Sequence, residues 1–97
     1  MTKADILAIL KSDLDIAGAT TSKDPLLGNL IDTSQAAISR EGISLSDPLT
    51  TEEGTLVEMY AAFLYRRRKD PTATMPHSLR YLLNNMLVAQ KAAPDEQ

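Results

Sequence analysis

Residues 51–69, TEEGTLVEMYAAFLYRRRK, decide the fold because they predict a helix that is apolar on more than one side. Thr50 and Glu53 have the spacing of a capping box, which marks a helix start, and Asp70-Pro71 ends the segment. One stripe contains Leu56, Val57, Tyr60, Phe63 and Leu64, and the other sides carry Met59, Ala61, Ala62 and Tyr65. Such a helix needs neighbours on most of its surface, so we expect it at the centre of the fold.

Two helices are expected before this segment. Thr2, which can accept hydrogen bonds from first-turn amides, opens a helix predicted over residues 2–14, and Gly18, which tolerates positive φ, is expected to end that region. Asp24-Pro25 predicts an N-cap followed by proline at the first position of a helix over residues 24–41. The buried stripe of this second helix is expected to be Leu27, Leu30, Ile31, Ser34 and Ile38.

One helix is expected after the central segment, over residues 76–92, opened by Pro76. Residues 43–46 alternate like a strand but are too few to form a sheet, so they predict an extended connection. Residues 93–97 are polar and are expected to form a mobile tail. The sequence therefore predicts an all-α fold, a compact four-helix bundle with short connections, in a single domain over residues 1–97.

Composition excludes several classes of function. The 97 residues carry a net charge of −3 and a pI near 5.0, which argues against a general nucleic-acid binder. The chain has no cysteine and one histidine, which argues against disulfides and zinc clusters and fits synthesis in a reducing cytoplasm. The start of the chain lacks the pattern of a signal peptide. The longest apolar run, residues 59–65, is far below the roughly 20 residues that span a bilayer.

The residues that could do chemistry do not form a catalytic pattern. Glu52, Glu53 and Glu58 follow a helix start, where the helix dipole favours acidic side chains, so a structural role is predicted for them. His77 falls in the first turn of a helix and has no second histidine or cysteine to complete a base–nucleophile or metal pair. The sequence therefore predicts a protein that is not an enzyme and binds no metal or cofactor.

Two sets of residues are candidates for contact with other molecules. A four-helix monomer of this size has difficulty covering every side of the central helix, so apolar residues beside the main stripes are candidates for a subunit or partner interface. They are Met59, Ala62, Tyr65 and Tyr81. A basic run ends the central helix and either stabilises the helix end or contacts DNA or an acidic partner. It consists of Arg66, Arg67, Arg68 and Lys69.

Four segments together resemble the small head–tail connector (adaptor, or head-completion) proteins of long-tailed bacteriophages and prophages. They are ILAILKSDLDI (6–16), DPLLGNLIDTSQAAISREGISL (24–45), LVEMYAAFLYRRR (56–68) and MPHSLRYLLNNMLVAQK (75–91). The most specific parts are the Tyr- and Ala-rich helix that ends in arginines and the Met-Pro segment before LRYLLNN.

The resemblance implies a structural virion protein at the head–tail junction, made in the host cytoplasm. Such a subunit forms a homo-oligomeric ring under the portal protein after DNA packaging. The ring extends the DNA channel and docks the next head-completion or tail protein. Double-stranded DNA would be a non-specific passenger in the channel, and neither a membrane nor any catalytic residue is implied.

One alternative from another class stays open. Small phage proteins are often helix-turn-helix regulators that bind DNA, and the last two predicted helices are joined by a short turn. The last helix would then be the recognition helix, but it carries few basic residues beyond Arg80 and Lys91, and the chain is acidic overall.

Overall fold

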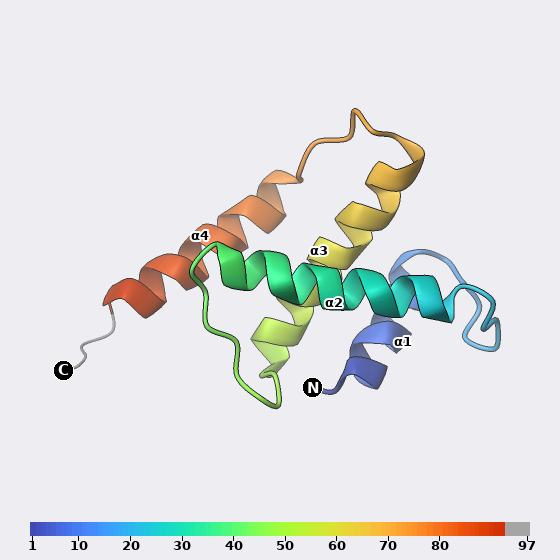
Figure 1. Cartoon of the computed structure of the whole chain (residues 1–97), viewed down its shortest axis with the longest axis horizontal. Coiled ribbons are helices and arrows are strands. Elements are labelled where there is room, and N and C mark those ends of the chain that lie inside the picture. The colour runs from blue at the N-terminus through green and yellow to red at the C-terminus, as the bar shows by residue number, and fades with distance from the viewer. Residues whose placement is uncertain (93–97) are drawn as a thin grey trace.

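The computed structural model describes residues 1–92 as four helices and no strand. They are α1 (Lys3–Asp13), α2 (Asp24–Arg40), α3 (Thr51–Lys69) and α4 (His77–Ala92), and α3 contacts each of the other three (Figure 1). The prediction of an all-α four-helix bundle is confirmed, and every helix end falls within one residue of its predicted position. The expected tail, residues 93–97, lies outside the described residues.

Capping boxes start both α1 and α3; the box at α3 was predicted, and at α1 the predicted cap Thr2 is joined by Asp5. Thr2 Oγ1 accepts from the Asp5 amide at 3.2 Å, and Asp5 Oδ2 accepts from the Thr2 amide at 2.9 Å. At α3, Thr50 Oγ1 accepts from the Glu53 amide at 3.1 Å, and Glu53 Oε1 accepts from the Thr50 amide at 2.9 Å. Glu53 also accepts from the Ser46 amide and hydroxyl, so the same carboxylate fixes the preceding connection. These local bonds explain why both starts could be predicted.

The predicted N-cap of α2 is wrong by one residue. Lys23 is the N-cap and makes no side-chain capping bond, whereas Asp24 is the first helical residue and Pro25 the second. Asp24 does not cap because its carboxylate is paired with the buried ammonium group of Lys11, 2.9 Å away. Proline is still tolerated there, since first-turn amides lack intrahelical acceptors.

The expectation that Gly18 supplies the positive φ after α1 is also wrong. α1 ends at Asp13, and the residue with positive φ is Asp15, at 59°. The chain turns early because the Ile16 amide donates to the Lys11 carbonyl at 2.7 Å and Ile16 packs against the core. Aspartate is one of the few residues other than glycine that occupies this region readily. After α2, Gly42 has a φ of 101°, at the predicted end of that helix.

The core lies where α1 and α2 pack on α3. The predicted stripe of α2 is confirmed, because Leu27, Leu30, Ile31, Ser34 and Ile38 are all buried. The Ser34 hydroxyl donates to the Leu30 carbonyl at 2.7 Å, which satisfies it inside the core. Residues 43–46 form no strand and run as a connection, as expected, with Ile43 buried.

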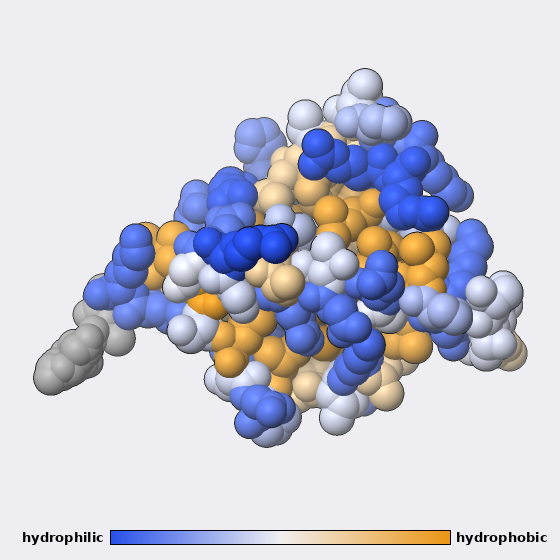
Figure 2. Space-filling model, in the orientation of Figure 1, coloured by the Kyte–Doolittle hydropathy of each residue, from blue (hydrophilic) through white to orange (hydrophobic). Residues whose placement is uncertain are grey.

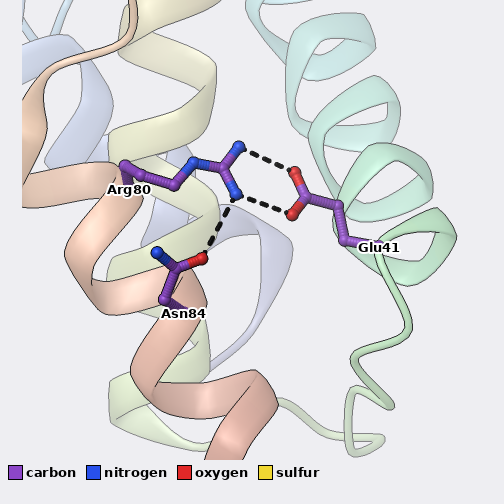
Figure 3. A network of polar contacts seen from close by, with 3 residues as sticks. All are labelled: Glu41, Arg80 and Asn84. Atoms are coloured by element: carbon purple, nitrogen blue, oxygen red, sulfur yellow. Dashed lines mark hydrogen bonds and ion pairs between the residues drawn. The ribbon is translucent and has the colours of Figure 1, made fainter.

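α4 is attached to the rest of the chain more thinly than the other helices. Its fully buried side chains are Leu79 and Leu83. Arg80 donates two hydrogen bonds to the Glu41 carboxylate, at 2.9 and 3.1 Å, and contacts Asn84 Oδ1 at 3.5 Å (Figure 3). Further along, Gln90 exchanges two hydrogen bonds with the backbone of Ser44, at 2.8 and 2.9 Å. Polar side chains therefore hold α4 to the end of α2 and the segment after it.

Candidate functional site

The predicted interface residues do not form one surface. Ala62 is 1% exposed and Tyr65 is 8% exposed, so the chain itself covers both, and the expectation of an uncovered side of α3 is wrong for them. Two helices, α1 and α2, pack against α3 from different directions and enclose more of it than the sequence suggested. Met59 is half-buried against the core. Tyr81 is 66% exposed on α4.

Tyr65 has a structural role at the end of α3. Its hydroxyl accepts a hydrogen bond from Lys23 Nζ at 2.8 Å, and Lys69 Nζ lies 5.4 Å from the ring centre. The hydrogen bond from Lys23 lowers the pKa of the Tyr65 hydroxyl, because it stabilises the ionised form. A charged residue introduced at position 65 would therefore disturb the fold and would not report on an interface.

The basic run predicted from the sequence forms a surface that we call the basic end, Arg66–Lys69. All four side chains are exposed. Arg66 Nη2 lies 3.7 Å from Asp13 Oδ1, and the Arg67 guanidinium carbon lies 5.8 Å from the ring centre of Phe63. Arg67 and Arg68 also border a shallow pocket of about 270 Å³ between α2 and α3. The helix dipole favours these charges, yet four cations exceed the half charge of about −0.5 at a helix end.

A groove lies at the opposite end of α3, between its first turns and α4. Its volume is about 630 Å³, and we call it the α3–α4 groove. Its lining residues are Thr50, Glu52, Glu53, Thr55, Leu56, Leu82, Asn85, Met86, Ala89 and Gln90. The aliphatic side chains make most of its surface apolar, while the exposed Glu52 adds a negative charge beside them. A groove of this size suits a few side chains of a partner.

The exposed apolar residues of α4 lie next to this groove. Tyr81 and Val88 are 66% and 63% exposed, and they stand about one helical turn before and after Asn85, which lines the groove. Figure 2 shows a small apolar patch among mostly hydrophilic residues over the C-terminal half of α4. α4 therefore presents a mixed apolar and polar surface that its own chain leaves open.

A larger hollow, of about 750 Å³, lies between the start of α1, the middle of α2 and residues 45–49. Its ionic contact is the exposed pair of Lys3 and Asp32, at 3.0 Å, which is solvated.

Glu58 corrects the expectation that the acidic residues of α3 all serve the helix start. Its side chain is buried, with the residue 6% exposed, and its Oε2 atom has no hydrogen-bond donor among the described residues. The carboxyl is a neighbour of Asp13, at the end of α1, and of Arg66. Burial, followed by the contact with Asp13, raises the pKa of Glu58 to about 8. Neutral pH therefore favours the protonated form of the Glu58 carboxyl over its ionised form.

The described residues hold no group of three or more His, Cys, Asp or Glu side chains that could bind a metal ion. His77 is exposed in the first turn of α4, where the sequence placed it. Among residues 1–92, no helix has the length and apolar character needed to cross a membrane.

Sequence reasoning missed Glu58 and Lys11, both of which the fold buries. The signal for Glu58 was its spacing from Gly54, Ala61 and Ala62, which places a carboxylate among small residues on one side of α3. Lys11 gave no comparable signal.

Comparison with known proteins adds no relative, since no family model, curated protein or solved structure matches this chain.

Proposed function

We propose that this protein is a structural subunit of a tailed phage or prophage that assembles into a ring beneath the portal protein. The observation that carries the proposal is the open surface of α4, where Tyr81 and Val88 are exposed beside the α3–α4 groove. Exposed apolar surface next to a groove is typical of protein–protein contacts. The all-α fold and the resemblance of the four sequence segments support the same assignment.

The proposal assigns no catalytic role and no cofactor. Within the described residues, the carboxyl groups of Asp13 and Glu58 are neighbours and Glu58 is closed to solvent, so the proposal gives this pair a structural role. A structural role for a ring subunit requires only stable packing and partner surfaces.

The geometry favours this proposal over a helix-turn-helix regulator. Residues 70–76 separate α3 from α4, and this shortest of the three described connections exceeds the turn of about 3–4 residues in that motif. Arg80 of α4 is bound to Glu41, so Lys91 is its one basic side chain without an ion pair among the described residues. Any contact of the basic end with channel DNA would be to phosphates, and hence weak and independent of sequence.

The test is the mass of the purified protein in solution, alone and with the portal of the phage or prophage that encodes it. We expect a ring-sized species, either in the free protein at high concentration or when the portal raises the local subunit concentration. Sedimentation velocity measures both. A chain that stays monomeric under both conditions would contradict the proposal, and tight binding to one DNA sequence at physiological salt would favour the regulator.

A further inference from the structure

Charge is distributed unevenly along α3. The C-terminal end carries Arg66–Lys69, whereas the first turn carries the exposed Glu52, next to Glu53, whose buried carboxylate is held in the capping box. The charged side chains at each end of α3 have the sign that the helix dipole favours. Their full charges are larger than the partial charge of about half a unit that the dipole places at each helix end. At the basic end, the nearby Asp70 is engaged with Thr72, whose hydroxyl donates to it at 2.6 Å. The two ends of this helix are therefore electrostatically complementary surfaces.

These surfaces cannot meet within one molecule. α3 has 19 residues, so its ends are about 28 Å apart. A contact between the basic end and the α3–α4 groove must therefore join two copies of the chain. Because the two surfaces differ, the contact is head-to-tail, and repetition of it produces a ring when the rotation between copies closes.

The groove and the basic end also match in polarity. Arginine side chains combine an apolar stem with a charged head, and the stems of Arg67 and Arg68 lie beside the half-buried Leu64. The groove offers Leu82, Met86 and Ala89 to such stems and the Glu52 carboxylate to a guanidinium group. Tyr81 and Val88 extend the apolar contact beyond the groove.

We propose that the basic end of one copy docks in the α3–α4 groove of the next, with Arg67 and Arg68 facing Glu52. This inference rests on the proposed ring function and names the residues that join neighbouring subunits. A basic surface could also bind DNA, and the test below distinguishes DNA binding from contact with a second copy.

The test uses two charge-reversed chains of full length. Glu52→Lys makes the groove basic, and the paired change Arg67→Glu with Arg68→Glu makes the basic end acidic. Each variant alone then brings like charges together, so we expect its association, measured by sedimentation with and without the portal, to need at least about tenfold higher concentration. Circular dichroism checks that each variant is folded.

Mixing supplies the decisive comparison. In an equimolar mixture, the unchanged basic end of the Glu52→Lys chain can meet the unchanged acidic groove of the Arg67→Glu, Arg68→Glu chain. The acidic end of the latter can likewise meet the basic groove of the Glu52→Lys chain. We expect association to return to within about threefold of the wild type. A single chain carrying all three changes should also associate again. Arg40→Glu, an exposed arginine on α2, is the matched control and should behave like the wild type.

The outcomes separate this inference from the proposed function. If the wild type assembles and the reversed variants assemble equally well, the contact is wrong and the ring proposal stands. If the variants assemble normally but the Arg67 and Arg68 variant loses retention of double-stranded DNA, the basic end serves DNA and the contact is again wrong. If the wild type assembles neither alone nor with the portal, both proposals fail.

Discussion

Lys11→Met is expected to lower the free energy of unfolding by about 3 kcal/mol, since it breaks a buried ion pair. Lys11 is 5% exposed, and its ammonium group lies 2.9 Å from Asp24 Oδ1. It also donates to the carbonyls of Gly18 and Thr20. Asp24 Oδ1 is buried and has no hydrogen bond among the described residues, so it depends on this ion pair. Methionine keeps the apolar stem and removes the ammonium group, with its charge and its hydrogen bonds.

Chemical denaturation of the wild type and the variant measures this effect. Lys3→Met is the matched control, because Lys3 pairs with Asp32 at 3.0 Å while both side chains are more than half exposed. Exposed pairs contribute about 0–1 kcal/mol, so the control should change little. Equal effects of the two substitutions would show that the Lys11 ammonium group does not hold the connection between α1 and α2.

Glu58→Gln is expected to make the protein more stable above pH 8 and to flatten its dependence on pH. The pKa of Glu58 is about 8 in the folded chain and near 4.5 without burial. The folded state therefore binds this proton more tightly than the unfolded state does. The resulting stabilisation of the fold is complete below pH 4.5 and is lost as pH rises through 8. Each pKa unit corresponds to about 1.4 kcal/mol, and we expect a difference on the order of 3 kcal/mol at pH 9.

The measurement is thermal or chemical unfolding of wild type and variant between pH 5 and pH 9. Glutamine keeps the shape of the side chain and a donor toward Asp13, so the two proteins should have similar stability near pH 5. Glu52→Gln is the control, since Glu52 is exposed at the start of the same helix. Parallel stability curves for wild type and Glu58→Gln would show that Glu58 is ionised in the folded protein at neutral pH.

The helices could be predicted because their signals are local. The capping boxes at Thr2 and Thr50 and the prolines at positions 71 and 76 act within a few residues of the helix ends that they define. The stripe of α2 follows from periodicity alone. These features need no knowledge of which helix packs on which.

The errors arose where distant segments meet. Asp24 has the residue type and position of an N-cap, but Lys11, thirteen positions earlier, takes its carboxylate. Ala62 and Tyr65 lie off the main stripe of α3, yet the chain buries them because α3 is packed on more than one side. In the sequence, Glu58 is an acidic residue like any other. Its pKa is raised only in the folded chain, because packing removes it from solvent and places it beside Asp13. Periodicity assigns a residue to a side of a helix, but it does not say which sides will be covered.

The same limit applies to the candidate site. The sequence identified Arg66–Lys69 as an exposed basic surface and Tyr81 as a contact residue, and both are exposed. It gave no indication of the α3–α4 groove, because a groove depends on how closely two helices approach. The charge difference between the two ends of α3 was visible in the sequence, and its relation to the groove required the structure.

The thin attachment of α4 has a consequence for motion. With Leu79 and Leu83 as its buried anchors and Arg80 and Gln90 as its polar ties, α4 can separate from α1–α3 at a lower free energy than global unfolding. Residues 70–76 would act as the hinge. Backbone amides of α4 should therefore exchange with deuterium faster than those of α2 and α3, and each opening would widen the groove. A subunit bound there would slow this exchange, so the protection of α4 amides would report on the proposed ring assembly at the level of single residues.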